Sequence, residues 1–444
     1  MENNNSRREF IKKSAVGTAG LALGASMFTS KSYGRIIGAN DRVNFAVLGL
    51  RSRAKGLLQG IAGSDNATIT DICDVDTRYL TEYSQLVEDK FGKKPNHHKD
   101  IRKMLKSKDI DAIAIATPEH WHAPMAIMGL QAGKHVYVEK PCSHNPWEGE
   151  LLVKAQRKYG KLVQMGNQQR SSAHTIAIIK RIHEGLIGKP YFGKAWYANT
   201  RGPIGVGKEG PVPDYLDWEL WQGPAPRRPY KDNIHPYNWH WFWHWGTGET
   251  LNNGTHEVDV CRWALDEGYP EKVSASGGRY HYDDDWEFYD TLITSYEYKD
   301  KMITWEGLSC QGKQYYNRGR GAMIHGTMGS VLIDRGGYIV YDRDNKEIEK
   351  FDANSADGSM DLVGAGPMTT MHFQNLLNGI RKGEPLHSPI DEGNISVTIL
   401  QLSNIAWKLG RELNLDTKTG HVMGDKEAKG LCKREYEKGW EPEL

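Results

Sequence analysis

Between Asp41 and Val163, short apolar strands alternate with helical segments, and this alternation constrains the fold more than any other feature. The strands are expected at residues 42–50, 67–76, 110–118, 135–141 and 161–167, and the helices at 54–62, 77–92, 122–133 and 146–160. Strands that are apolar throughout are typical of a parallel sheet covered by helices on both faces. The sequence therefore predicts an α/β domain with a doubly wound parallel sheet over residues 41–170.

A glycine or a polar residue stands at the carboxyl end of each predicted strand. These residues are Gly49, Asp74, Thr117, the pair Glu139 and Lys140, and Asn167. Ligands of open α/β sheets bind in the crevice outside the carboxyl ends of the strands. The five strand ends are therefore expected to meet at one ligand-binding crevice.

The segment VLGLRSRA joins the first strand to its helix, where a dinucleotide-binding Rossmann fold has the pattern G-x-G-x-x-G. Gly49 occupies the first glycine position, whereas Arg51 and Ala54 replace the second and third. Asp74 follows Ala54 by 20 residues (74 − 54), close to the spacing of about 20 expected of the acid that binds the ribose. A carboxylate there repels a 2′-phosphate, so NAD is favoured over NADP; a solvated turn acid is the alternative. The expected phosphate contacts are Arg51, Ser52 and Arg53.

The segment GKHVYVEKPC carries Glu139 and Lys140 directly out of a predicted strand. Lys140 is thereby placed beside the nicotinamide, whose positive charge would lower the pKa of the amine and let it accept the proton of an alcohol. Pro141 restricts the backbone of the turn. A salt bridge between the two charged neighbours is the alternative, but adjacent strand residues point to opposite faces.

The sequence pattern changes near residue 185. Residues 202–248 are rich in Pro, Gly and Trp. A helix is expected at about 254–265, antiparallel strands at 272–282, 288–298, 301–310, 322–334 and 338–342, and further helices at 368–383 and 394–413. The sequence predicts a second domain, 171–444, of the α+β class with a large, open, mainly antiparallel sheet, whose C-terminal helices pack back on the first domain.

Residues 1–33 are interpreted as a twin-arginine export signal. Arg7 and Arg8 are followed by Phe10 and by an apolar run over 15–28 that is too short and too rich in Gly and Ala to span a membrane well. A frayed tail that holds two arginines is the weaker alternative. The mature chain is therefore expected in the periplasm, without a membrane span, folded and loaded with cofactor before export.

Charge and cysteine content exclude several classes of function. Lys plus Arg number 57 and Asp plus Glu 56, so the net charge of +1 gives no electrostatic basis for binding nucleic acid or an anionic membrane. The five cysteines form no CxxC pair, so neither a disulfide framework nor a zinc site is expected. We expect no bound metal.

The chain resembles the glucose–fructose oxidoreductase, inositol dehydrogenase and MocA (Gfo/Idh/MocA) family over nearly everything after the signal. The resemblance is carried by ATPEHWHAPMAIMGLQAGKHVYVEKP, by GNQQR at 166–170, by GTHEVDVCRWAL at 254–265, and by HFQNLLNGIRKGEP and SNIAWKLGREL near the C-terminus. It implies a Rossmann domain, a second domain whose sheet serves in homodimers or tetramers, and hydride transfer between NAD(P) and a ring hydroxyl of a sugar or cyclitol.

The resemblance also implies roles for single residues. Lys140 matches the lysine of the family's EKP motif, and His256 matches its catalytic histidine. Many members have an aspartate four residues before that histidine; Asn252 stands there in this chain, and it can hold a hydroxyl but takes no proton. The ATPEHWH segment supplies the expected cofactor contacts Thr117, Pro118, His120 and His122.

The aromatic segment HPYNWHWFWHWGTGE directly precedes the predicted catalytic helix. Metal binding by His235, His240 and His244 is one interpretation, but their spacing does not repeat and the family needs no metal. The segment is otherwise a packed aromatic loop or a wall for the C–H face of a sugar, and the wall is favoured. The expected substrate contacts are Asn252, His256, Arg170, Trp243 and Trp245, with Gln168 as a further candidate for substrate or cofactor.

These features predict an exported NAD-dependent oxidoreductase that transfers hydride between a nicotinamide cofactor and a ring hydroxyl of a sugar or glycoside. Because no large NAD pool exists outside the cytoplasm, the cofactor is expected to be retained. The alternative is a redox-neutral glycosidase that works by oxidation, elimination, hydration and reduction on bound NAD. The exported NAD-dependent α-N-acetylgalactosaminidases resemble the chain at GLR (49–51), but they lack the EKP lysine and have HGVGP where the chain has NGTHE. A non-catalytic sugar-binding protein is the third possibility, which the presence of both Lys140 and His256 disfavours.

Overall fold

The structure is a computed structural model that describes residues 42–352 and 366–444. The export signal predicted at 1–33 lies outside the described residues. None of the described helices is both long and apolar enough to cross a membrane.

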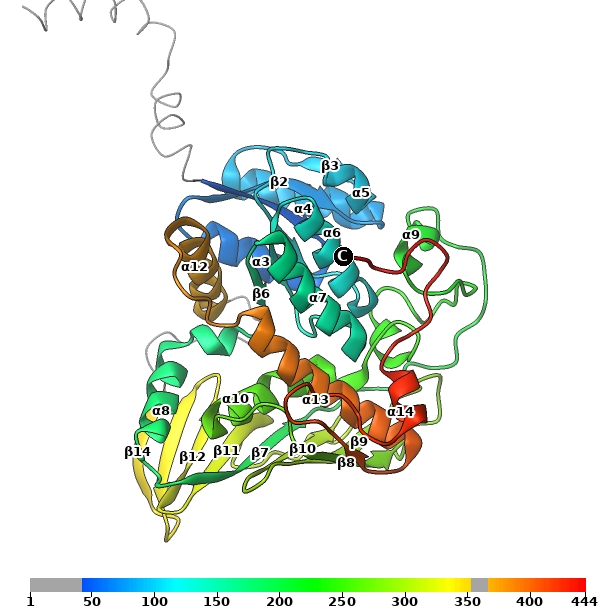
Figure 1. The fold of residues 1–444 in the computed structure, drawn as a ribbon. Helices are drawn as coiled ribbons and strands as arrows, with labels where there is room; N and C mark the ends of the chain where they lie inside the picture. The colour runs from blue at the N-terminus through cyan, green and yellow to red at the C-terminus, as the bar shows by residue number, and fades with distance from the viewer. Residues whose placement is uncertain (1–41, 353–365) are drawn as a thin grey trace, which may run out of the picture. The chain divides into compact units, whose positions relative to one another are not determined.

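Within the described residues, the first sheet has six strands in the order β3-β2-β1-β4-β5-β6. The strands are β1 (Val43–Leu48), β2 (Ala67–Cys73), β3 (Asn96–His98), β4 (Ala112–Ile115), β5 (His135–Val138) and β6 (Val163–Met165). The pairs β2/β3, β1/β4, β4/β5 and β5/β6 are parallel. The connecting helices are α3 (Ser52–Ala62), α4 (Thr77–Phe91), α5 (Ile101–Met104), α6 (His122–Gln131) and α7 (Pro146–Tyr159) (Figure 1).

Local sequence sets the ends of these helices. The Asp76 side chain accepts the backbone N–H of Arg78 at the start of α4, and Gly92 ends that helix in the left-handed conformation (φ 70°). At α7, the Asn145 side chain caps the first turn and Pro146 occupies its first position. These caps fix where each strand end stops and where each helix begins, which positions the crevice residues.

The second sheet has nine described strands in the order β14-β13-β12-β11-β7-β10-β9-β8-β15. They are β7 (Pro190–Ala198), β8 (Lys272–Gly278), β9 (Thr291–Glu297), β10 (Met302–Leu308), β11 (Arg320–Gly326), β12 (Gly329–Asp334), β13 (Gly337–Asp342), β14 (Glu347–Asp352) and β15 (Leu413–Asn414). The β7/β10 pair is parallel, whereas the other pairs with a recorded register are antiparallel.

Two helices of the second domain, α10 (Thr255–Leu265) and α13 (Ile390–Leu409), cover one face of this sheet (Figure 1). Gly193 of β7 permits the close approach of α10, because a Cβ at that position would lie 2.9 Å from the Cβ of Cys261. The remaining described helices of this domain are α8 (Ala173–His183), α9 (Trp218–Gln222), α12 (Pro367–Lys382) and α14 (Lys426–Leu431). Four short helical turns occur along the described chain. They are η1 (Glu119–Trp121) and η2 (Gln168–Ser171) in the first part, and η3 (Asn238–Trp241) and the π-helical turn η4 (Thr250–Gly254) in the second.

Segments of the second domain pack directly on the first. Helix α12 lies against α3, where a Cβ on Gly60 would meet Phe373 at 2.8 Å, and Phe373 stacks on Tyr137 of β5 (4.4 Å between ring centroids). The segment 199–249, between β7 and η4, reaches the end of β2: Thr77 donates its N–H to the Tyr215 carbonyl (3.0 Å). The crevice is therefore walled by both domains.

The predicted fold class is confirmed: a six-stranded parallel Rossmann sheet precedes a domain with a large, mostly antiparallel sheet. Helix α3 begins at Ser52, two residues before the predicted start, because the glycine-poor turn leads straight into the helix. The sequence pattern did not predict strands β3, β7, β14 and β15 or the helices α5, α8, α9 and α14. The predicted segment 322–334 contains most of β11 and all of β12, joined by a hairpin turn.

Candidate active site

A cavity of about 260 Å³ opens at the carboxyl ends of the first sheet. Its lining includes Gly49 after β1, Asp74 after β2, Thr117 after β4, and Glu139 with Lys140 after β5. Asn167, after β6, is buried and does not line this cavity. The structure therefore brings four of the five predicted strand ends to one cavity, which we call the cofactor cavity.

Gly49 is required by the turn that follows β1. Its φ is +78°, and a Cβ there would lie 2.6 Å from both the Ala116 carbonyl oxygen and the Thr117 nitrogen. Any other residue would be strained and would push apart the ends of β1 and β4. Glycine thus lets these two strand ends meet beneath the cavity.

Arg51, in the second glycine position, lines the cavity without filling it. Its guanidinium carbon lies 5.5 Å from the centroid of the Tyr237 ring, a distance typical of a cation–π contact. Helix α3 starts at the next residue and has no acidic residue in its first turn. Its positive N-terminal end, with Ser52 and Arg53 in the cavity wall, is suited to a pyrophosphate.

The Asp74 carboxylate is fixed by backbone donors. Leu50 N–H donates to Oδ2 (2.7 Å) and Asp76 N–H donates to Oδ1 (2.8 Å). Burial raises the pKa of Asp74 to about 6, although these hydrogen bonds oppose the shift. The carboxylate stands at the strand end where a dinucleotide-binding fold holds the ribose hydroxyls.

The cofactor cavity also contains a polar atom that the described residues leave unsatisfied. Thr117 Oγ1 is buried in its wall and has no hydrogen-bond partner in the described part of the chain. Buried polar groups in native proteins nearly always have partners, so a ligand is expected to supply one. The glycine turn, the helix N-terminus, Asp74 and Thr117 together fit a dinucleotide such as NAD.

Lys140 lies at the inner end of the cavity. Its Nζ donates to the backbone carbonyl of Asn252 and to Asn252 Oδ1 (3.3 Å). Burial lowers the pKa of the lysine to about 8, against the opposing effect of Glu139 and Glu119. The sequence prediction assigned this shift to the nicotinamide charge; in the structure burial is its largest cause, and the nearby charges of Arg320 and Arg335 add to it.

Neighbouring side chains hold Lys140 in place. His122 bridges the loops after β4 and β5, with Nδ1 2.6 Å from the Pro141 carbonyl and Nε2 2.8 Å from the Thr117 carbonyl. Glu139 forms an ion pair with Arg53 Nε (2.8 Å). Burial alone would raise the pKa of Glu139, but the Arg53 guanidinium lowers it below its usual value. Arg53 and Glu139 both line the cofactor cavity, and their ion pair braces the turn that carries Lys140.

A second cavity, of about 990 Å³, lies between the cofactor cavity and the second sheet, and we call it the substrate cavity. The residues that line both cavities are Arg53, Glu139, Lys140, Tyr237 and Asn252. Predicted His256 also lines the substrate cavity. Lys140 and Asn252 therefore stand at the junction of the two spaces.

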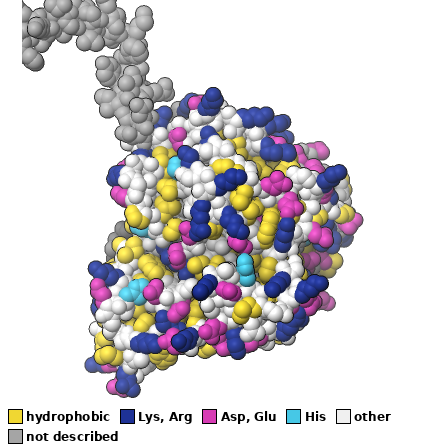
Figure 2. Space-filling view, viewed as in Figure 1, with side chains coloured by type: hydrophobic (Ala, Val, Ile, Leu, Met, Phe, Trp, Pro, Cys, Tyr) yellow, Lys and Arg dark blue, Asp and Glu magenta, His cyan; other side chains and the backbone are white. Residues whose placement is uncertain are grey.

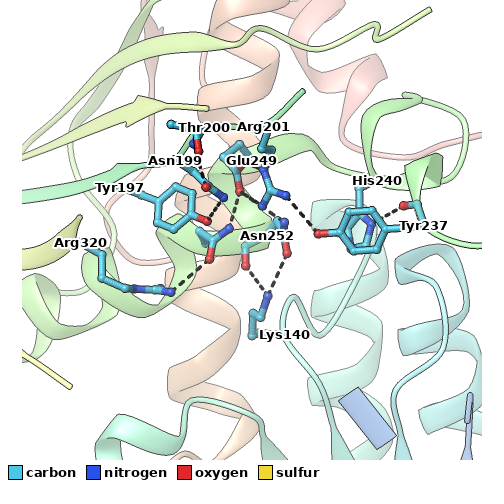
Figure 3. Close-up of polar contacts among 11 residues, drawn as sticks. Lys140, Tyr197, Asn199, Thr200, Arg201, Tyr237, His240, Glu249, Asn252 and Arg320 are labelled. Atoms are coloured by element: carbon cyan, nitrogen blue, oxygen red, sulfur yellow. Dashed lines mark hydrogen bonds and ion pairs between the residues drawn. The ribbon is translucent and has the colours of Figure 1, made fainter. Parts of the chain in front are cut away.

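A hydrogen-bonded network around Glu249 positions Asn252 (Figure 3). The Glu249 carboxylate accepts from Asn252 Nδ2 (3.3 Å), from Asn253 Nδ2 and from the Arg201 guanidinium. Arg201 also donates to the Tyr237 hydroxyl (3.3 Å). Asn252 belongs to the π-helical turn η4, a rare conformation that is frequent at functional sites, and this turn aims the residue at Lys140.

His256 is one helical turn after Asn252, and it is 6% exposed. Its pKa lies well below the usual value because of burial first, and then because of the positive charges of Arg335 and Lys140. The ring is therefore neutral at pH 7, so one of its nitrogens can accept a hydrogen bond from a substrate hydroxyl.

Glu119 is a cavity residue that the sequence pattern did not single out. It follows Pro118 in η1, is 1% exposed, and lines the cofactor cavity beside Lys140. Thr247 Oγ1 donates to its carboxylate. Burial raises the pKa of Glu119 to about 7, although Thr247 and Lys140 favour the ionised form. Its place within the quoted ATPEHWH segment was the signal that could have identified it.

Several predicted site residues lie elsewhere. Arg170 forms a buried ion pair with Asp259 (Nε–Oδ2 2.7 Å), so its guanidinium is already satisfied away from both cavities. Buried His120 donates from Nε2 to the Trp221 carbonyl (2.8 Å). Trp245 packs in an aromatic core with Trp218, and Trp243 stacks on Phe288. Neither tryptophan lines a cavity.

Other residues of the same aromatic segment form the cavity wall instead. His235, Pro236, Tyr237, Trp239 and His240 line the cofactor cavity, and Tyr237 also lines the substrate cavity. Two aromatic residues from outside the segment contribute as well: Trp221 of α9 lines the cofactor cavity and Tyr197 of β7 lines the substrate cavity. In the described ranges, no three His, Cys, Asp or Glu side chains are grouped as metal ligands. Tyr237 is the residue of this segment that lines the substrate cavity among the described residues, so the sugar wall stays a prediction, and the two tryptophans expected to form it line neither of the two cavities.

Comparison with known protein families agrees with this architecture. Residues 43–167 match the model of an oxidoreductase family with an NAD-binding Rossmann fold, and residues 177–442 match that family's C-terminal α/β domain. The chain belongs to the Gfo/Idh/MocA oxidoreductase family. Its first domain is accordingly an NAD-binding Rossmann domain.

Similarities to curated relatives and to solved structures agree with the assignment of the chain to the Gfo/Idh/MocA family. A glycosyl hydrolase family 109 protein from Shewanella pealeana is 27% identical over 207 residues, which are 43% of this chain and 45% of the relative. The WlbA dehydrogenase from Bordetella pertussis, in complex with NADH and UDP-GlcNAcA, has a TM-score of 0.62 at 21% identity, covering 84% of this chain and 99% of that one. A levoglucosan dehydrogenase in complex with NADH has a TM-score of 0.66 at 16% identity, covering 85% and 100%.

The two comparisons have different weight. The chain matches less than half the length of the curated glycosidase relative, so their shared part does not fix a common activity. The solved dehydrogenases share the fold over nearly their whole length, at identities that establish the fold alone. The chemistry of this family member must therefore be argued from its own cavity residues.

Proposed function

We propose that the protein is an NAD-dependent oxidoreductase that transfers hydride between its nicotinamide cofactor and a ring hydroxyl of a sugar or glycoside. One observation carries the proposal: Lys140 lies where the cofactor cavity and the substrate cavity share residues. A base at that junction can reach a hydroxyl whose carbon faces the cofactor. NAD, when bound, supplies a hydride acceptor and donor.

The residues around the junction divide the remaining tasks. Lys140, with its lowered pKa, accepts the hydroxyl proton as the alcohol is oxidised and returns it on reduction. Asn252 positions the lysine amine and offers its amide to the substrate. His256, neutral and on the same wall of the substrate cavity, accepts a hydrogen bond from a second hydroxyl. Tyr197 and Tyr237 provide ring faces for the apolar side of a sugar.

We also propose that the protein is exported to the periplasm through the twin-arginine pathway with its cofactor retained. Arg7, Arg8 and the short apolar run after them support export. Residues of the 199–249 segment line the cofactor cavity opposite the first sheet, which supports retention. Turnover with a retained cofactor requires a second sugar or another external acceptor to take the hydride.

A homo-oligomer formed through the second sheet belongs to the same proposal. Helices α10 and α13 cover one face of that sheet, and Ile293 of β9 is 57% exposed. A partner sheet would remove such apolar side chains from water.

The second candidate is a glycosidase that uses bound NAD without net redox change. The relationship to the glycosyl hydrolase family 109 protein favours it, as does Glu119, a second proton carrier that lines the cofactor cavity together with Lys140. The EKP lysine, which the family resemblance associates with dehydrogenases, favours the first candidate. A sugar-binding protein without chemistry is the third candidate.

One experiment separates the three. The full chain is purified, its nucleotide is released and identified by mass spectrometry, and the protein is then incubated with glycosides while nicotinamide absorbance and sugar products are followed. An oxidised sugar with stoichiometric reduced cofactor supports the oxidoreductase, whereas free sugar without redox change supports the glycosidase. Failure to bind any nucleotide, as purified or added, would leave only the sugar-binding protein.

The Lys140→Met variant is the matched control, because methionine keeps the length and removes the base. It is expected to bind nucleotide and to transfer hydride about 10²–10⁴-fold more slowly. If nucleotide is absent after purification but added NAD restores turnover, the retention of the cofactor is wrong and the oxidoreductase assignment stands.

A further inference from the structure

The substrate cavity is lined by an excess of positive charge. Among the described residues that line it, the basic side chains are Arg53, Lys140, Arg201, Arg318, Arg320 and Arg335. The acidic side chains among them are Glu139, Asp334 and Asp352. Because low-dielectric walls focus the field of the charges that line a cleft, this composition favours a negatively charged ligand.

The placement of the counter-charges strengthens this effect. Arg320 pairs with Glu257 (Nε–Oε1 2.6 Å), and Arg201 pairs with Glu249. Neither glutamate lines the substrate cavity, and they are only 3% and 1% exposed. In these two pairs the carboxylate lies behind the guanidinium group and the positive end faces the cavity, whereas the carboxylates that pair with Arg53 and Arg318 belong to the lining themselves.

Three of the arginines come from one corner of the second sheet. Arg318 and Arg320 stand at the start of β11, and Arg335 lies in the turn between β12 and β13. The antiparallel register that pairs Ala322 with Ile333 brings this turn beside the start of β11. Arg318 pairs with Asp334, which also lines the cavity, whereas the partner of Arg320 lies behind it, so at this corner three guanidinium groups and one of these two carboxylates belong to the lining. We call Arg318, Arg320 and Arg335 the arginine corner.

The field of this corner reaches the reacting end of the cavity. After burial itself, Arg335 has the largest effect in lowering the pKa of His256. Arg320 and Arg335 also lower the pKa of Lys140. The outer surface is different: on the face seen in Figure 2, basic and acidic side chains are interspersed. The positive character belongs to the cavity rather than to the protein as a whole.

We propose that the substrate is an acidic glycoside, whose carboxylate or sulfate ester binds the arginine corner while a ring hydroxyl lies at Lys140. This inference rests on the proposed function and specifies its substrate class. Guanidinium groups suit both anions, because their planar fork of donors matches paired oxygens. The side chains of Gln314 and Asn317, also in the lining, offer additional amide donors at the same corner.

The test compares phenyl glucosides that differ only at carbon 6, in both anomeric forms: the neutral glucoside, the glucuronide and the 6-sulfate. Cofactor reduction gives kcat/KM for each. A charge-assisted contact predicts a kcat/KM at least about tenfold higher for one of the acidic substrates than for the neutral one. A preference for the glucuronide or for the sulfate identifies which anion is used. Equal values for all three would overturn the inference and leave the oxidoreductase in place.

Arg335→Gln is expected to reduce the acidic-to-neutral ratio of kcat/KM to within about threefold of unity. Arg343→Gln is the matched control: it removes the same charge from the exposed β13–β14 turn, outside the cavity, and should leave the ratio unchanged. A ratio that survives Arg335→Gln contradicts the assigned corner.

Calorimetric binding of the glucuronide and the 6-sulfate to the purified protein gives a readout without turnover. The inference is supported if either acidic glycoside binds more tightly than the neutral one and if Arg335→Gln weakens this binding. This holds even if no hydride is transferred, and in that case only the proposed function fails. Binding that is equally weak for all three glycosides counts against the arginine corner.

Discussion

The state of Lys140 makes the rate of hydroxyl oxidation depend on pH in a defined way. The pKa of the buried amine is lowered to about 8 from an ordinary value near 10.5. At pH 7, about one lysine in ten is then neutral, compared with about one in 3,000 for an unperturbed lysine. Burial therefore increases the fraction of active base by about 300-fold, and the single-turnover rate of oxidation should rise with pH to a plateau above about pH 8.

Glu119→Gln tests the electrostatic origin of the rising limb of this pH–rate profile. The Glu119 carboxylate raises the pKa of Lys140 because a negative charge stabilises the ammonium form. Glutamine keeps the shape and can still accept the hydrogen bond from Thr247, but it removes the charge. The pKa of Lys140 should fall, so the rising limb should move to lower pH, by up to about one unit for a carboxylate close to the amine.

The assay is stopped-flow absorbance of the reduced nicotinamide in a single turnover, measured from pH 5.5 to about 9.5. Lys140→Arg should abolish the limb, because a guanidinium does not lose its proton in this range. Glu82→Gln, on the exposed side of α4, removes an equal charge far from the cavity and should leave the profile unchanged. A limb that stays in place, or moves to higher pH, in Glu119→Gln would refute the coupling of these two groups.

Two stability predictions follow from the packing. Gly49→Ala should weaken NAD binding and lower the thermal midpoint of unfolding, because it adds both left-handed backbone strain and a clash at 2.6 Å. Gly92→Ala is the control: its φ is +70° but no atom lies within 4 Å of the added Cβ, so it adds the strain alone and should have smaller effects in both measurements. Asp259→Asn should destabilise the fold by roughly 3–5 kcal/mol in urea unfolding, because it leaves Arg170 buried without its counter-charge. Asp300→Asn, in the exposed pair with Lys189, should cost about 1 kcal/mol or less. Equal effects of the two substitutions would contradict the burial argument.

The first domain could be predicted from the sequence because its determinants are local. Five strands of the parallel sheet are short apolar runs, each followed by a residue type that suits a ligand crevice; the polar edge strand β3 has no such pattern and was not predicted. The position of Lys140 followed from its place two residues after the end of β5, and no tertiary contact was needed to find it. The same holds for Asp74, where the strand and the offset from the glycine turn were enough.

The partners of Lys140 could not be predicted in this way. Asn252 contacts it from 112 residues away, through a π-helical turn that no sequence pattern announces. The family resemblance placed Asn252 near the substrate, but it did not reveal that the amide and the carbonyl of this residue hold the lysine. Arg320 and Arg335 are separated still further from the motifs, and the pairing register of two strands brings them together.

Arg170 shows why a charged residue at a strand end is a weaker signal than it seems. It follows β6 as the pattern requires, but Asp259 of α10 captures it in a buried pair. A buried guanidinium needs a counter-charge, and the nearest one in space is 89 residues away in the chain. The aromatic segment presents the same difficulty: its rings are predictable, but which of them face the cavity depends on how the segment folds against the first domain.

That folding has a consequence for how the cofactor is held. Asp217 donates its backbone N–H to the Val75 carbonyl (3.0 Å), next to the residue that is placed to bind the ribose. Trp221, from the same segment, lines the cofactor cavity and stacks on Trp218 within a buried aromatic cluster. Opening the cavity on this side would separate backbone hydrogen bonds and expose that cluster to water, and both changes cost free energy. The cofactor retention that we propose would therefore depend on the second domain. The turn after β1 in the first domain, which has only the first glycine of the fingerprint, contains no sequence signal for retention.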